Sequence, residues 1–345
     1  MTVTDKSIEE FASRLQRQML AFGRARVPLA EVVDKDRIVV AGAQIFRIPS
    51  DWSFHQFLLS YGKGQLGADW VRANLEKGSR AHPVVTYLAN GLAGIRAAGR
   101  SEGNFAKLTM NGELYAFLSF AYDLFTLADN AKVQQSLLSR VRHADQFQGA
   151  RYEIYIAASL LRAGFKIEFE DEADSKSTHC EFAATHKKTG RTFSVEAKSR
   201  HRKSGDSFNE TFGKAGVYRI LQEALLKRAS HERIVFADVN LPYDSRLPFE
   251  EDWHREVGNT LTELERNQRS DDPWPQAIVF FTNRKTSPWP GKQGRQHSTI
   301  LVTAINHPLF KVNDRARVET EYPDVGNLFY AANNLCEPPS HFFGQ

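Results

Sequence analysis

The spacing of apolar and polar positions divides the chain into two parts with different expected secondary structure. Up to about residue 140, apolar residues recur mostly at helical spacing. The elements predicted here are helices at 8–22, 51–59, 67–76, 83–98 and 112–128, and short strands at 37–40 and 44–48. We therefore expect a mainly helical N-terminal domain over residues 1–140.

From about residue 141 the pattern alternates between helices and strands. A helix from about 146 is expected to end at Gly164, because glycine suits a helix C-cap. The elements predicted after it are strands at 165–169, 178–185 and 191–198, a helix at 215–229, a strand at 233–237, a helix at 253–266 and strands at 277–281 and 299–303. This order predicts an α/β (α+β) chain whose second domain, residues 141–345, has three layers.

Overall composition is that of an ordinary globular protein, with 41% hydrophobic and 25% charged residues. The net charge of +4 is too small to establish a nucleic-acid partner. The longest apolar stretch, 115–128, is interrupted by polar residues and is too short to span a bilayer. With no apolar N-terminal region, we expect a cytoplasmic protein without a membrane partner. The two cysteines are far apart and lack CxxC spacing, so neither a zinc site nor a disulfide framework is indicated.

Four residues between positions 148 and 198 carry the candidate chemistry. Glu153 lies in an otherwise apolar helix, where a carboxylate needs a partner or a wet cleft. Glu181 lies in the second predicted strand of this domain, and Glu196 and Lys198 lie in the third. Each of these strands alternates apolar and polar positions, so the acidic residues share a polar face.

The turn between the two strands decides whether the acidic residues meet. If Lys188 and Thr189 form its centre, Glu181 lies directly opposite Glu196, with the Cβ atoms about 5 Å apart. A shift of two residues pairs Glu181 with Lys198 on the same face, whereas a shift of one residue separates them.

Two opposed carboxylates repel unless a cation lies between them. Mg²⁺ typically takes one or two carboxylates, with water and substrate phosphate in its other positions. We therefore expect Glu181 and Glu196 to hold Mg²⁺, with Mn²⁺ as a substitute, for the hydrolysis of a phosphodiester bond. Lys198 could orient the attacking water or offset charge on the phosphate, and Glu153 could hold a metal-bound water.

This arrangement resembles the PD-(D/E)XK, or restriction-endonuclease-like, nuclease superfamily. The resemblance covers roughly residues 148–198 and extends loosely to 237. It implies a nuclease core with a central mixed sheet, metal ligands Glu181 and Glu196, catalytic Lys198 and Glu153 as the helix acid. Glu181 stands where the superfamily most often has aspartate, and Cys180 where proline is common.

The resemblance implies a nuclease that acts on nucleic acid, with DNA as the expected substrate, in defence or repair. The basic residues Arg200, Arg202 and Lys203 follow Lys198 and could bind the flanking phosphates, although such a run is usually a solvated loop. A catalytically silent nuclease-like domain that binds nucleic acid or protein is an alternative. A further alternative is a structural interaction protein in which these acidic residues form ordinary ion pairs. The N-terminal domain could mediate homo-oligomerisation or bind a protein partner.

Overall fold

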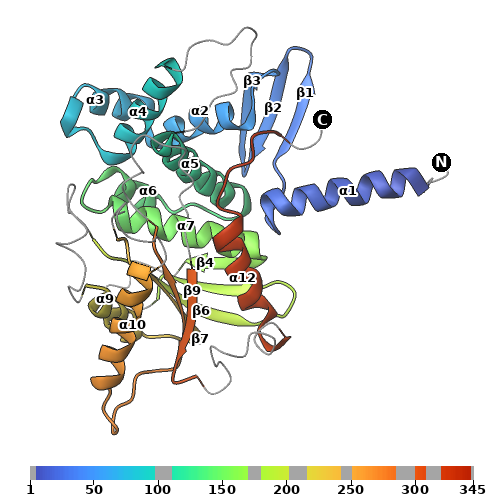
Figure 1. Cartoon of the computed structure of the whole chain (residues 1–345). Helices are drawn as coiled ribbons and strands as arrows, with labels where there is room; N and C mark the ends of the chain where they lie inside the picture. Colours follow the sequence, from blue (N-terminus) through green and yellow to red (C-terminus); the bar gives the residue numbers. More distant parts are fainter. Residues whose placement is uncertain are drawn as a thin grey trace.

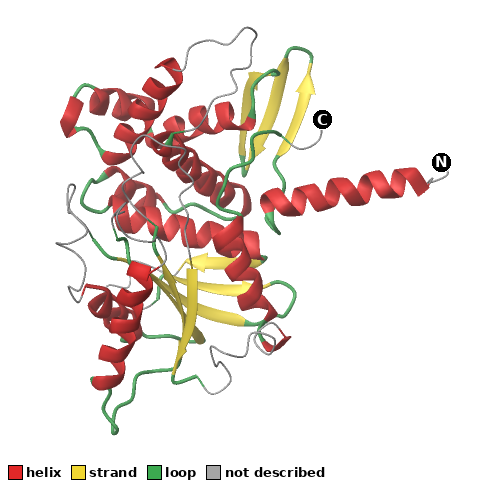
Figure 2. Cartoon of the chain, viewed as in Figure 1, coloured by secondary structure: helices red, strands yellow, loops and turns green. Residues whose placement is uncertain are grey.

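The structure is a computed structural model that describes residues 5–97, 111–169, 180–201, 216–241, 251–284, 300–307 and 320–342. Within these residues it has ten α-helices, a three-stranded sheet and a six-stranded mixed sheet (Figures 1 and 2). The predicted mixed α/β class is confirmed. No helix in the described part of the chain has the length and apolar character needed to cross a membrane.

The N-terminal part is mainly helical, as predicted. Its helices are α1 (Asp5–Phe22), α2 (Phe54–Leu66), α3 (Ala68–Leu75), α4 (Pro83–Ala97) and α5 (Gly112–Asn130). Strands β1 (Leu29–Val33), β2 (Asp36–Ala41) and β3 (Gln44–Pro49) form an antiparallel sheet. Helix α2 begins at a capping box, because the Ser53 side chain accepts from Gln56 N while the Gln56 side chain accepts from Ser53 N. Strand β1 was not predicted.

The C-terminal part is built around the six-stranded sheet. Its helices are α6 (Gln135–Arg142), α7 (Phe147–Ala163), α9 (Gly216–Leu225), α10 (Glu251–Arg266) and α12 (Pro323–Asn334). Its strands are β4 (Phe165–Phe169), β5 (Phe182–His186), β6 (Thr192–Ser199), β7 (Glu232–Asp238), β8 (Ala277–Thr282) and β9 (Ile300–Ile305). They lie in sequence order, β6–β7 and β7–β8 being parallel and the other pairs antiparallel.

Helices cover both faces of this sheet, giving the three layers that the element order predicted. Val195, Phe236 and Phe280 belong to the large core that α7 and α12 share. Val235 and Phe281 belong to a second core with α9 and α10. Successive residues of β7 therefore enter opposite cores, as strand geometry requires.

Helix α7 is the central element of the fold. It is buried along almost its whole length and packs against α5, α6, α12, β4 and β6. It ends at Gly164, whose φ of 95° places it in the left-handed region that favours glycine. The predicted C-cap is therefore confirmed, and β4 starts at the next residue.

One hydrophobic core continues across the predicted domain boundary near residue 140. Helix α5 of the N-terminal part packs on α7 of the C-terminal part. The end of the chain then returns to the N-terminal part, where the Phe342 ring lies 5.1 Å from Phe54 and 5.8 Å from Phe57, measured between ring centroids. Packing is therefore not interrupted where the sequence pattern changes.

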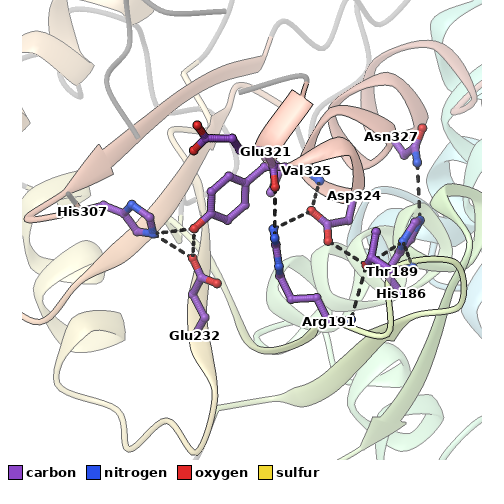
Figure 3. A network of polar contacts seen from close by, with 10 residues as sticks. His186, Thr189, Arg191, Glu232, His307, Glu321, Asp324, Val325 and Asn327 are labelled. Carbon is purple, nitrogen blue, oxygen red and sulfur yellow. Dashed lines mark hydrogen bonds and ion pairs between the residues drawn. The ribbon is translucent and has the colours of Figure 1, made fainter. Parts of the chain in front are cut away.

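Helix α12 is fastened to the β5–β6 turn by a polar network (Figure 3). The buried Asp324 carboxylate accepts hydrogen bonds from Thr189 Oγ1 (3.0 Å) and Val325 N (3.0 Å), and it pairs with Arg191 Nη1 (3.3 Å). The Thr189 amide in turn donates to His186 Nδ1 (3.3 Å). A second contact beside it joins His307 Nε2 to Glu232 Oε1 at 2.7 Å. The turn that sets the β5–β6 register is thus held by a helix distant in sequence.

Replacing Asp324 with alanine should destabilise the protein by about 2–4 kcal/mol, because it leaves the Thr189 hydroxyl and the Arg191 guanidinium without their buried acceptor. Chemical denaturation measures the change. Asp271→Ala is the matched control, since Asp271 forms an exposed ion pair with Arg269 and its loss should change stability little. Equal stability of Asp324→Ala and the wild type would show that the network does not hold α12.

Candidate functional site

The β5–β6 hairpin has the register that brings the two acidic strands together. Phe182 pairs with Val195 and Thr185 with Thr192, so Glu181, the residue before β5, is next in line opposite Glu196. The turn closes through Gly190, whose φ is 71° and whose amide donates to the His186 carbonyl at 2.8 Å. The predicted register is confirmed.

The side chains of Glu181, Glu196 and Lys198 converge. Lys198 Nζ lies 2.9 Å from Glu196 Oε1 and 3.7 Å from Glu181 Oε1. Glu196 is fully buried, whereas the side chains of Glu181 and Lys198 are 21% and 26% exposed. Glu196 therefore forms the base of the site, and the other two side chains form its solvent side.

A second lysine reaches Glu196 from the residues that follow α9. Lys227 Nζ lies 3.8 Å from Glu196 Oε1. Lys198 Nζ lies within hydrogen-bonding distance of Glu196 Oε1, whereas no hydrogen-bond donor from the described part of the chain reaches Oε2. The two ammonium groups thus offset its charge but leave acceptor capacity on a buried carboxylate. Lys227 was missed, because nothing in local spacing links it to β6.

The Glu153 carboxylate pairs with Arg140 of α6. Its Oε1 accepts from Arg140 Nη1 at 2.9 Å, and Oε2 pairs with Arg140 Nη2, so the contact is bidentate. Burial raises the pKa of Glu153 to about 7, although Arg140 opposes the shift. The charge of Glu181 also raises this pKa, and the charge of Lys198 lowers it. Glu153 therefore lies within electrostatic reach of the site, with its carboxylate held by Arg140.

Burial also controls the charge of the central carboxyl group. It raises the pKa of Glu196 to about 7, although Lys198 opposes the shift and the charge of Glu181 adds to it. Burial alone would lower the pKa of Lys198, but the charges of Glu196 and Glu181 outweigh it and raise that pKa. Near neutral pH the site therefore holds an ammonium group beside a carboxyl group that readily exchanges its proton.

A buried aspartate joins the carboxyl ends of three strands beside the site. Asp238 at the end of β7 accepts from Ser199 Oγ (3.0 Å), Thr282 Oγ1 (2.9 Å) and Arg284 N (2.8 Å). Ser199 directly follows Lys198, so these bonds fix the end of β6 relative to β7 and β8. Sequence reasoning missed Asp238, whose only signal was an acid at the end of an apolar strand.

Of the three residues predicted to bind phosphate, the structure describes only Arg200. Arg200 is buried, its Nη1 lies 3.3 Å from Glu256 Oε1, and its carbonyl accepts from Asn240 Nδ2 at 2.8 Å. Its guanidinium thus pairs with α10 in the interior, where the sequence suggested a solvated loop. Arg202 and Lys203 lie outside the described residues.

Few side chains at this site could act as metal ligands. Within the described ranges, no cluster of three or more His, Cys, Asp and Glu side chains is close enough to hold a metal ion. The pair Glu181 and Glu196 remains, which is within the one or two carboxylates that Mg²⁺ typically takes from a protein. Glu196 Oε1 has the Lys198 ammonium group at 2.9 Å, but Oε2 has no hydrogen-bond donor among the described residues and could bind a cation.

The chain matches no protein-family model, no curated protein and no solved structure.

When a chelator removes divalent cations, replacing Glu196 with glutamine should change how the stability of the protein depends on pH. Because the pKa is raised from 4.5 to about 7 on folding, the wild type loses stability as pH rises through this range. The variant lacks this loss, so its stability relative to the wild type should increase between pH 5 and pH 8 by about 1–3 kcal/mol.

Denaturant unfolding at both pH values measures the effect. Glu168→Gln is the control, since Glu168 forms an exposed ion pair with Lys166 on β4. A stability difference between Glu196→Gln and the wild type that does not change with pH would show that the Glu196 carboxyl group is not strained by burial.

Proposed function

We propose that this protein is a metal-dependent nuclease that hydrolyses phosphodiester bonds in nucleic acid, with DNA as the substrate. The observation that carries the proposal is the convergence of Glu181, Glu196 and Lys198, with Glu196 fully buried and its Oε2 lacking a hydrogen-bond donor among the described residues. Lys198 offsets part of the charge of the two acids, and a ligand could occupy the acceptor positions that remain. A divalent cation supplies positive charge there, and a phosphate group supplies its remaining oxygen ligands.

Glu181 and Glu196 are the residues that would hold the cation. When bound, Mg²⁺ polarises the phosphoryl group and lowers the pKa of water at the site. The buried Glu196 provides a rigid anchor at the base, and the partly exposed Glu181 is positioned at the entrance, where substrate arrives.

Lys198 would act on the phosphate from the solvent side of the site. Its ammonium group is raised in pKa and therefore stays charged at neutral pH. A fixed positive charge beside the phosphate stabilises the negative charge that develops as the nucleophile attacks. Lys227 adds a second, more distant positive charge, and Arg140 holds Glu153 in place near the same group of charges.

The order of elements also supports this proposal. Helix α7, strands β4, β5 and β6, helix α9 and strand β7 follow the pattern of the nuclease superfamily that the sequence resembles, with the glutamate, the second acid and the Glu-x-Lys residues on α7, just before β5 and on β6. A role in defence or repair rests on that resemblance alone.

A catalytically silent binding module is the second candidate, and the ion pairs favour it. Arg140 pairs with Glu153, and both Lys198 and Lys227 lie near Glu196. These contacts offset much of the acidic charge without a metal ion, as expected of a domain that no longer catalyses hydrolysis.

If the site holds a cation, Mg²⁺ or Mn²⁺ should bind the wild type and raise its melting temperature, because binding to the folded state adds stability. Glu196→Gln should lose most of this response, and Glu168→Gln, on the exposed surface of β4, should retain it. Calorimetric titration measures the binding directly. Equal cation binding by the wild type and Glu196→Gln would place the ion elsewhere.

Lys198→Met should keep the fold and most metal affinity but lower the rate of DNA cleavage about 10²–10³-fold, because it removes a preorganised positive charge. Lys227→Met should cost less, about tenfold, since its ammonium group is farther from Glu196. Lys166→Met is the control, because the Lys166 side chain on β4 is exposed, and this variant should cleave DNA at the wild-type rate. Single-turnover cleavage of plasmid, linear DNA and RNA measures these rates.

Filter binding on the same proteins separates the two candidates. The nuclease proposal expects substrate affinity to fall much less than the cleavage rate, because other basic residues still contact phosphates. A binding module would show no cleavage with any cation and only a modest change in affinity. Full cleavage by folded Lys198→Met would remove this lysine from the mechanism.

A further inference from the structure

Helix α1 stands away from the rest of the molecule (Figure 1). Its C-terminal end is anchored by the buried Phe22 ring against Phe54 and Tyr122 and by a hydrogen bond from Tyr122 Oη to the Ala21 carbonyl (2.8 Å). From Ala12 to Leu20 every described side chain is exposed except the half-buried Gln18. The helix is 18 residues long, and most of the stability of helices in proteins comes from packing of an apolar face.

The exposed part of α1 carries an apolar strip. Leu15 and Met19, one helical turn apart, are 50% and 41% exposed, and the neighbouring Leu20 is 61% exposed. Apolar residues at helical spacing normally face a packing partner. In the described part of the chain this strip has no such cover.

Charge along α1 changes sign from one end to the other. The sequence before residue 11 has three acidic residues, Asp5, Glu9 and Glu10, against one Lys6, whereas the second half has Arg14 and Arg17 and no acidic residue. This distribution also suits the helix dipole, but the dipole does not account for the exposed apolar strip. A second α1 in antiparallel orientation matches both, because it sets the acidic end of each helix beside the basic half of the other. A parallel pair would set like charges together.

We propose that α1 is a dimerisation helix that pairs antiparallel with α1 of a second copy of this chain. A two-fold axis perpendicular to the helices generates this pair from a single self-complementary surface, and the charge distribution favours it over a parallel pair. Two helices of this length bury less than the roughly 1,600 Å² of a standard interface, so we expect a dissociation constant in the micromolar range. The inference is independent of the nuclease proposal, since it uses no residue of the candidate site.

Sedimentation velocity across the micromolar range tests the pairing, without metal or nucleic acid. The wild type should form a dimer, and the double substitution Leu15→Glu with Met19→Glu should be monomeric with an unchanged melting temperature of the body. Leu75→Glu is the matched control, a leucine at the end of α3 that is 45% exposed, and it should remain dimeric. A monomeric wild type, or a dimer that survives the α1 substitutions, overturns the proposal.

Charge reversal tests whether charge complementarity between two α1 helices drives the pairing. Arg14→Glu with Arg17→Glu makes both halves of the helix acidic, and Glu9→Lys with Glu10→Lys makes both halves basic, so each variant alone should be monomeric. Mixed together, the two variants should form a heterodimer, recovered through an affinity tag on one of them. Failure to form the heterodimer while the wild type is dimeric would show that charge complementarity does not drive the pairing, and would overturn the proposed charge-matched α1 pair.

Discussion

The register of the β5–β6 hairpin is the constraint on which both the fold and the candidate site depend. A slip of one residue would turn Glu196 and Lys198 to the opposite face and expose the apolar residues that pack under α7. The turn itself is short and polar and would not resist such a slip alone. Asp324 of α12 binds Thr189 in the turn and Arg191 just before β6, and α12 is packed on α7. A helix near the end of the chain thereby secures the pairing on which the site is built.

The site contains equal numbers of acidic and basic side chains. Three acidic side chains, Glu153, Glu181 and Glu196, lie near three basic ones, Arg140, Lys198 and Lys227. Burial makes full ionisation of Glu153 and Glu196 unfavourable, as the raised pKa of each shows. Binding of a cation would reverse this by favouring the carboxylate forms, so metal binding would release protons and strengthen as pH rises through about 7. Under the proposed metal-dependent function, burial would thus couple metal binding to the protonation of the site.

The elements with strong periodic patterns could be predicted from sequence, and those that depend on tertiary contacts could not. The start of β4 after Gly164 and the alternation in β6 were readable because backbone geometry and side-chain direction impose them locally. Strand β1 was missed because it is an edge strand with mostly exposed side chains and thus no clear burial pattern. Helix α12 was missed because its Gly326 and asparagines lower its helical propensity, while its burial against α7 stabilises it.

The same division applies to the site. The convergence of Glu181, Glu196 and Lys198 followed from one turn and the two-residue period of strands, so local sequence sufficed. The partners that set their energetics come from elsewhere: Arg140 from α6, Lys227 after α9 and Asp238 from β7. The burial of Arg200 could not be predicted for the same reason, because its partner Glu256 comes from α10. Sequence spacing can place acids and bases on one face, but only the packing of distant helices decides which charges are neutralised and which remain available to a ligand.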